Sequence, residues 1–251
     1  MTSRRALKTN QQNRRDFLHA AGTVVAAALA GNLPFAALAQ TSTKMKIGTL
    51  GSGRVGSAIG AAWVKAGHEV MFSSLDLEAD KKLAASLGAG ARAGTPREAA
   101  AFGDVLLVSV PYTALPGLGR DLGDLIKGKI VIDTSNPIVA RDGDMAVAAR
   151  AKGAGIASME FLPGARIVRA FNAIGAARMA EAASKSERVG MPIAGDDPNA
   201  ISVASALVRD AGYEPVLVGS LAAMGKYLVP GTPLSGERSP EEIRKVAAAL
   251  K

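Results

Sequence analysis

The chain has 251 residues, no cysteine, and 30 Lys and Arg against 22 Asp and Glu, which gives a formal net charge of +8. The lack of cysteine excludes disulfides, thiolate nucleophiles and cysteine-ligated metal sites. Residues 1–39 hold five of the basic residues and one acid, so the rest of the chain keeps a net charge of only about +4, without a dense basic run. A nucleic-acid-binding protein is therefore not expected.

The first 39 residues are predicted to be an export signal. Residues 14–18 read RRDFL, residues 20–39 are uncharged and mostly small or apolar, and the segment ends in Ala37-Leu38-Ala39. Paired arginines before an apolar run and a small-x-small cleavage pattern resemble a twin-arginine signal peptide. We expect the twin-arginine machinery to export the protein to the periplasm, with cytoplasmic residence if the signal is not used. An uncleaved membrane anchor is the alternative, but glycines and a proline interrupt the apolar run.

Residues 46–76 are predicted to form a strand, a glycine turn, a helix and a second strand. Lys46–Leu50 is short and apolar, Ser57–Lys65 has a helical pattern, and Glu69–Phe72 has the pattern of a second strand. The segment between the first strand and the helix, Gly51–Gly56, reads GSGRVG and matches the GxGxxG pattern. Strand, motif, helix and strand in this order favour a dinucleotide-binding site.

Each glycine of the motif has a physical role in such a site. Gly51 permits a tight turn out of the strand, Gly53 lets backbone N–H groups approach a pyrophosphate, and Gly56 lets the helix pack on the strand. The helix N-terminus then presents free N–H groups and partial positive charge to the diphosphate. A glycine turn that serves packing alone is the alternative.

The rest of the chain alternates between expected strands and helices. Strands are expected at 104–110, 129–133, 167–170, 191–194 and 214–218; helices at 81–87, 95–102, 115–126, 146–151, 178–184, 199–211 and from 239 onward; and a glycine-rich connection at 88–94. Nearly continuous apolar runs such as DVLLVSV are typical of parallel strands buried on both faces. The pattern predicts an α/β fold: a Rossmann-type, doubly wound, mostly parallel sheet with flanking helices. Residues 40–251 would form one compact domain with a short C-terminal helical extension.

Ligands of open α/β sheets bind at the carboxyl ends of the strands. The residues expected to line this edge, besides Gly51, Ser52, Gly53, Arg54, Val55 and Gly56, are Ser73, Ser74, Val110, Pro111, Tyr112, Asn136, Phe171, Asn172 and Ala173. The alternative for several of them is that they only terminate strands, as turn residues commonly do.

Acid–base and metal chemistry has little support in the sequence. His68 is the one histidine beyond residue 39, and we expect it to be a solvated turn residue. The acids are scattered without an obvious catalytic pair, so no catalytic side chain and no metal ligand is predicted. A nucleotide site without an acid–base set suits hydride transfer, in which the cofactor carries the chemistry.

The choice between NADP and NAD depends on the residues after the second strand. An acid there would bind the ribose 2′-hydroxyl, whereas an arginine would favour a 2′-phosphate. The strand ends in Ser73-Ser74-Leu75, and the two hydroxyls could donate to a phosphate. We therefore favour NADP(H). Asp76 leaves NAD open if its side chain turns inward.

The motifs together resemble the family of F420-dependent NADP oxidoreductases over about residues 46–230. The resemblance is carried, besides the glycine turn, by AGHEV at 66–70, SVPY at 109–112, VRAFN at 168–172, IAGDDP at 193–198, DAGY at 210–213 and GSL at 219–221. It implies a Rossmann domain that binds NADPH and moves a hydride to or from a deazaflavin or flavin, without an obligate acid or base. It also implies cofactor contacts at Ser52–Val55, Ser74, Val110, Asn136 and Asn172. Leu75 departs from the pattern, because an arginine that binds the 2′-phosphate is common there.

The sequence therefore predicts an NADP(H)-dependent oxidoreductase with a small redox acceptor. F420, a flavin, a quinone and a ferric chelate remain open as acceptors, and a homodimer is compatible with the sequence. The alternative is an exported dinucleotide-binding module without catalysis, which acts as a sensor or partner protein.

Overall fold

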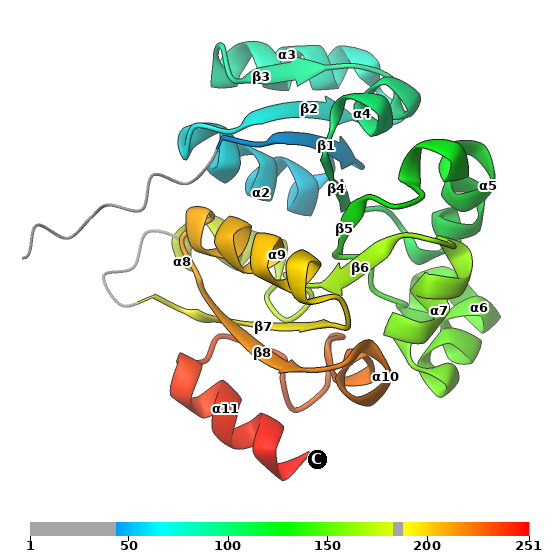
Figure 1. Cartoon of the computed structure of the whole chain (residues 1–251), viewed down its shortest axis with the longest axis vertical. Coiled ribbons are helices and arrows are strands. Elements are labelled where there is room, and N and C mark those ends of the chain that lie inside the picture. The colour runs from blue at the N-terminus through cyan, green and yellow to red at the C-terminus, as the bar shows by residue number, and fades with distance from the viewer. Residues whose placement is uncertain (1–43, 183–187, 251) are drawn as a thin grey trace, which may run out of the picture. The chain divides into compact units, whose positions relative to one another are not determined.

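The computed structural model describes residues 44–182 and 188–250, and the predicted signal segment lies outside these residues. The described residues form one eight-stranded sheet in the order β3-β2-β1-β4-β5-β6-β7-β8 (Figure 1). Its strands are β1 Lys46–Leu50, β2 Glu69–Ser73, β3 Ala91–Ala93, β4 Val105–Val108, β5 Ile130–Asp133, β6 Arg166–Arg169, β7 Gly190–Gly195 and β8 Glu214–Gly219. Neighbouring strands are parallel except β6 and β7, which run antiparallel. The prediction of a mostly parallel, Rossmann-type sheet is confirmed.

Helices lie on both faces of this sheet (Figure 1). They are α2 Arg54–Lys65, α3 Leu77–Leu87, α4 Pro96–Phe102, α5 Leu115–Ile126, α6 Val139–Lys152, α7 Ala154–Phe161, α8 Ala176–Ala182, α9 Pro198–Asp210, α10 Leu221–Met224 and α11 Pro240–Ala249, with 3-10 turns η1 Tyr112–Ala114 and η2 Gly225–Tyr227. Thr95 and Ser239 form capping boxes that start α4 and α11, and Asp197 caps α9. Each of these three helices has proline in its first turn, where the missing N–H costs nothing.

The sheet separates two hydrophobic clusters. One contains Trp63, Phe72 and Leu107, and the other contains Leu106 and Leu115. Neighbouring residues of β4 thus enter opposite clusters, because successive side chains of a strand point to opposite faces. Burial on both faces explains why the central strands read as continuous apolar runs.

Two connections differ from the sequence prediction. Residues 88–94 were expected to be a glycine-rich connection, but Ala91–Ala93 forms edge strand β3 against β2. The pairing comes from a neighbouring strand, so small residues without a strand pattern can adopt it. Helix α7 was not predicted, and α6 is longer than expected but interrupted at Gly143, whose φ of 55° is not helical.

Within the described ranges, no helix is both long and apolar enough to cross a bilayer.

Candidate nucleotide-binding site

The glycine turn connects β1 to α2 at the centre of the sheet, where β1 lies between β2 and β4. The chain reverses its winding at this point, which is where folds of this kind bind dinucleotides. Gly51 has φ +99°, and a Cβ there would lie 2.3 Å from the carbonyl oxygen of Ser109. A Cβ on Gly56 would lie 2.0 Å from the carbonyl oxygen of Gly51. The packing of the turn itself therefore requires glycine at both positions.

Gly53 differs from these two glycines. Its φ of −64° is open to any residue, and a Cβ there would meet no atom within 4 Å. Gly53 is the N-cap of α2, and no side chain caps this helix. The first turn of a helix leaves N–H groups without intrahelical partners. The open space and the uncapped helix end together fit a diphosphate, which would bind at residues Gly53–Gly56.

On the β2 side, the two predicted serines have different roles. Ser73 is fully buried, and its hydroxyl donates to the carbonyl oxygen of Thr49 at 2.7 Å. Its own carbonyl accepts the N–H groups of Gly51 and Ser52 at 2.9 and 3.0 Å. The expected ligand contact of the Ser73 side chain is therefore wrong, because the hydroxyl faces the sheet and the residue instead holds the glycine turn against β2.

Ser74 and Ser52 meet at a residue that the sequence did not single out. Both hydroxyls donate to the carboxylate of Asp80 on α3, Ser74 at 2.8 Å, and Asp80 is only 2% exposed. Asp76 accepts the N–H of Ala79 and caps α3 rather than facing the glycine turn. Leu75 is completely exposed. The sequence around Asp80 gives no sign of this role, because only the tertiary structure brings the fourth residue of α3 to the glycine turn.

On the other side of the glycine turn lie the ends of β4, β5 and β6. A Cβ on Gly51 would lie 2.9 Å from Cγ1 of Val110, so the turns after β1 and β4 touch. The Asn136 side-chain oxygen accepts N–H groups from Asn172 and from Arg169, each at 3.3 Å. The structure thus places Val110 against the glycine turn and Asn136 against Asn172, and Pro111, next to Val110 in the chain, is exposed.

A buried arginine supports these two asparagines. Arg169 is fully buried at the end of β6 and donates to Asp133 Oδ2 at 2.6 Å, to the Ser135 carbonyl at 3.1 Å and to the Leu228 carbonyl at 2.9 Å. Asp133 also accepts the hydroxyl of Ser158 at 2.8 Å. Arg169 stands within the VRAFN segment, but the sequence gave no reason to assign it a role. Its partners come from two separate segments of the chain, residues 133–136 and Leu228.

Three buried polar atoms of this network lack a hydrogen-bond partner, namely Asn172 Oδ1, Ser135 Oγ and Arg169 Nε. A buried polar atom without a hydrogen bond costs about 1–3 kcal/mol. A carboxamide or ribose hydroxyl of a nicotinamide nucleotide carries the donors that would satisfy the two oxygen atoms. The residues at the ends of β5 and β6 therefore fit the nicotinamide half of a dinucleotide.

Two other predicted lining residues, Tyr112 and Phe171, turn their side chains away from this edge. Tyr112 is fully buried, donates to the Ala154 carbonyl at 2.9 Å, and has its pKa raised to about 12 by burial. Phe171 has φ 62°, and its ring contacts Trp63 and Tyr213 in edge-to-face geometry. Side-chain contact with a ligand is therefore wrong for Tyr112 and Phe171, since the apolar core holds both rings. Ala173 is buried, and its carbonyl accepts the Gly236 N–H at 2.8 Å.

The prediction for His68 is also wrong. Its side chain is buried rather than solvated, since Nδ1 accepts the Met45 N–H at 3.2 Å and Nε2 lies 3.0 Å from Asp210 Oδ2. The turn after α2 places it under the end of α9, where it joins that helix to the start of β1. The role of His68 is therefore structural.

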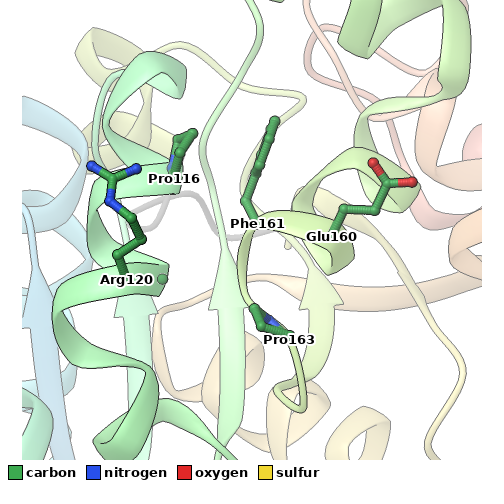
Figure 2. Close-up of a pocket in the computed structure, with 6 residues that line it drawn as sticks. Pro116, Arg120, Glu160, Phe161 and Pro163 are labelled. Atoms are coloured by element: carbon green, nitrogen blue, oxygen red, sulfur yellow. The ribbon is translucent and has the colours of Figure 1, made fainter.

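No group of three or more His, Asp or Glu suited to a metal ion occurs among residues 44–182 and 188–250. A pocket does occur between α5 and α7, lined by Pro116, Gly119, Arg120, Glu160, Phe161 and Pro163. Figure 2 shows Pro116 and Arg120 on one side of it and Phe161 and Glu160 on the other. None of the glycine-turn or strand-end residues lines this pocket, so it is separate from the nucleotide site.

The sheet order and the glycine turn at the reversal point define a Rossmann-type dinucleotide-binding fold. Residues 46–137 match the family described as NADP oxidoreductase, coenzyme F420-dependent. The matched segment contains β1 to β5 and the glycine turn, so this part of the chain is similar to that family. The resemblance inferred from the sequence is confirmed over these residues.

The chain is also similar to individual proteins. The chain is 29% identical over 181 residues to Metalloreductase STEAP3 of Rattus norvegicus, a match that covers 71% of this chain and 34% of the relative. The chain thus spans about a third of that protein. A hypothetical protein from Sinorhizobium meliloti superposes with a TM-score of 0.65 at 25% identity, covering 80% of this chain and 97% of that one. A candidate F420-dependent NADP-reductase from Arthrobacter sp. FB24 gives a TM-score of 0.58 at 19% identity, covering 74% and 90%, and this likeness shows the fold.

Proposed function

We propose that the chain transfers a hydride between a nicotinamide dinucleotide and a deazaflavin or flavin acceptor. The observation that carries this proposal is the open space at Gly53, at the uncapped start of α2 and at the reversal point of the sheet. The protein's own packing requires Gly51 and Gly56 but not Gly53. A bound diphosphate explains why position 53 is also glycine.

In this proposal the protein binds and orients, and the cofactor supplies the hydride. Gly53–Gly56 bind the diphosphate, and Asn172 Oδ1 accepts a donor of the nicotinamide half. Asn136 and Arg169 hold Asn172 in place. A bound nicotinamide nucleotide would supply the hydride, and these residues would orient it toward the acceptor. No side chain needs to act as an acid or base.

The acceptor is proposed from the family description and from the relatives. The family description names coenzyme F420, a deazaflavin. The relative STEAP3 is a metalloreductase, and a ferric ion accepts one electron at a time. A hydride carries two electrons, so a flavin would have to divide them before a ferric chelate could be reduced. An experiment can therefore distinguish the two candidate acceptor systems, which are F420 on the one hand and a flavin with a ferric chelate on the other.

We also propose that the protein works in the periplasm, after export by the twin-arginine machinery. This rests on the RRDFL segment and the apolar run after it. Free nicotinamide nucleotide is scarce outside the cytoplasm, so the cofactor would be exported in bound form. This route carries folded proteins, which makes such export feasible.

The test is a titration of the full-length purified protein with NADPH and with NADH, followed by nicotinamide fluorescence. FMN, F420 or FMN with ferric citrate is then added in separate samples. Binding followed by loss of nicotinamide fluorescence is the expected result, and the acceptor that causes the loss is identified. If neither nucleotide binds at millimolar concentration, the proposed function is wrong.

Tight binding without oxidation by any acceptor would instead support a sensor or partner protein that binds a dinucleotide. A fluorescence change that persists in the Gly53→Val variant would show that the nucleotide binds elsewhere.

A further inference from the structure

One buried carboxylate engages both hydroxyls that could serve the adenosine half of the cofactor. Ser52, in the glycine turn, donates to Asp80 Oδ1, and Ser74, directly after β2, donates to Oδ2 at 2.8 Å. Asp80 lies near the start of α3 and is 2% exposed. An ionised carboxylate only accepts hydrogen bonds, so both serines must direct their protons toward Asp80.

This carboxylate lies where the fold places the adenosine ribose. In dinucleotide-binding folds, an acid after the second strand binds the ribose 2′-hydroxyl, whereas an arginine there accommodates a 2′-phosphate. Here Ser73–Asp76 contains no basic residue, Leu75 is fully exposed, and Asp76 is used to cap α3. Asp80 therefore stands in for the missing strand-end acid, although it comes from the helix.

The geometry points to Asp80 as a specificity-determining residue that makes this chain favour NADH over NADPH. Two serine protons leave about half of the carboxylate's roughly four acceptor positions free, which is enough for a ribose 2′-hydroxyl. A 2′-phosphate carries a charge of about −1.5 to −2 at neutral pH and would be repelled by Asp80. The hydroxyls of Ser52 and Ser74 could not donate to this phosphate, because both already donate to Asp80. This inference rests on the proposed function, since it requires a dinucleotide at the glycine turn.

The preference would depart from the family description, which names NADP. Two residues near the expected position of the adenosine ribose account for this preference for NADH. Asp80 adds a negative charge, and Leu75 provides no positive charge that could offset it.

The experiment compares the dissociation constants of NADH and NADPH for the full-length protein at about pH 7.5, where the 2′-phosphate is mostly dianionic. We expect NADH to bind about tenfold more tightly. Asp80→Asn keeps the shape of the side chain and removes its charge. It should therefore reduce the ratio of the NADPH to the NADH dissociation constant about fivefold, by strengthening NADPH binding. Glu78→Gln is the matched control, because Glu78 is an exposed acid of α3 paired with Lys81 at 2.7 Å. The ratio of the two dissociation constants for Glu78→Gln should match that of the unmodified protein.

A second measurement needs no variant. ADP and adenosine 2′,5′-bisphosphate compete with NADH for the unmodified protein, and ADP should be the stronger competitor. If Asp80→Asn fails to fold, as judged by circular dichroism, this competition still tests whether the site disfavours a 2′-phosphate.

The inference is overturned if the unmodified protein binds NADPH as tightly as NADH or more tightly. An unchanged ratio in folded Asp80→Asn would overturn it as well. Both results leave the proposed function standing, whereas failure of both nucleotides to bind would remove the proposed function itself.

Discussion

Arg169 and Asp133 form an ion pair 2.6 Å long between Nη1 and Oδ2, and neither side chain is exposed to solvent. The pair joins the ends of β6 and β5, and Arg169 also donates to Asn136, which in turn accepts an N–H of Asn172. Charges taken out of water are tolerated when they are paired and hydrogen-bonded, as Nη1 and Nη2 of Arg169 are, although its Nε has no partner. The floor of the site is therefore held by charge-assisted hydrogen bonds rather than by apolar packing alone.

Removal of one partner of this pair should be costly. Arg169→Met leaves Asp133 buried without its cation, and the expected loss of folding free energy is about 3–5 kcal/mol. Urea unfolding measures it. In the double variant Arg169→Met/Asp133→Leu no charge is left unpaired, so the loss should be smaller than in Arg169→Met. Equal losses in both would mean that the charge pair itself is not what stabilises this region.

Gly53 and Gly56 should respond to substitution in opposite ways. Gly53→Val places its side chain in open space, so the protein should fold with a nearly unchanged melting temperature but lose nucleotide binding. Gly56→Val would overlap the Gly51 carbonyl, since even a Cβ lies 2.0 Å from that oxygen. We expect this variant to unfold at lower temperature or to fail to fold. Thermal melts and NADH titration distinguish the two, and nucleotide binding by folded Gly53→Val would refute the placement of the diphosphate.

An arginine at position 75 should strengthen NADPH binding. Leu75 is fully exposed, so Leu75→Arg should not disturb the fold. A charge-assisted contact with the 2′-phosphate would contribute about 1–3 kcal/mol, with little change for NADH. Leu75→Gln is the neutral control of similar length. If the gain is the same for NADH and NADPH, the introduced guanidinium does not reach the 2′-phosphate.

Alkaline stability should depend on Tyr112. Burial raises its pKa to about 12, against about 10 in an unfolded chain. The folded state therefore retains its proton to higher pH than the unfolded state. This contribution to stability is complete below pH 10 and is lost as the pH rises toward 12.

Tyr112→Phe removes that titration along with the hydrogen bond to the Ala154 carbonyl. At pH 8 the variant should be about 1 kcal/mol less stable, because the hydrogen bond is lost. Between pH 9 and 11 it should lose about 1 kcal/mol less than the unmodified protein does. Urea unfolding at the three pH values measures both effects. Parallel stability curves for the two proteins would show that Tyr112 titrates normally.

Local patterns in the sequence determined the glycine turn, the apolar central strands and the starts of α4, α9 and α11. In each case the signal lies within a few residues: glycine spacing, a continuous apolar run, or a cap followed by proline. The same locality explains the confirmed fold class, since alternating strands and helices have few ways to form a parallel sheet.

The tertiary structure alone decided which side chains face the site. Ser73, Tyr112 and Phe171 follow strands as expected, but the backbone path turns their side chains into the sheet or the core. Asp80 and Arg169 enter the site from a helix and a strand whose own patterns give no sign of it, because their partners are 6 to 59 residues away along the chain. His68 is buried for the same reason, since its partner Asp210 is 142 residues distant. Sequence spacing predicts which elements meet, whereas hydrogen-bond partners far apart in the chain determine which polar groups remain free for a ligand.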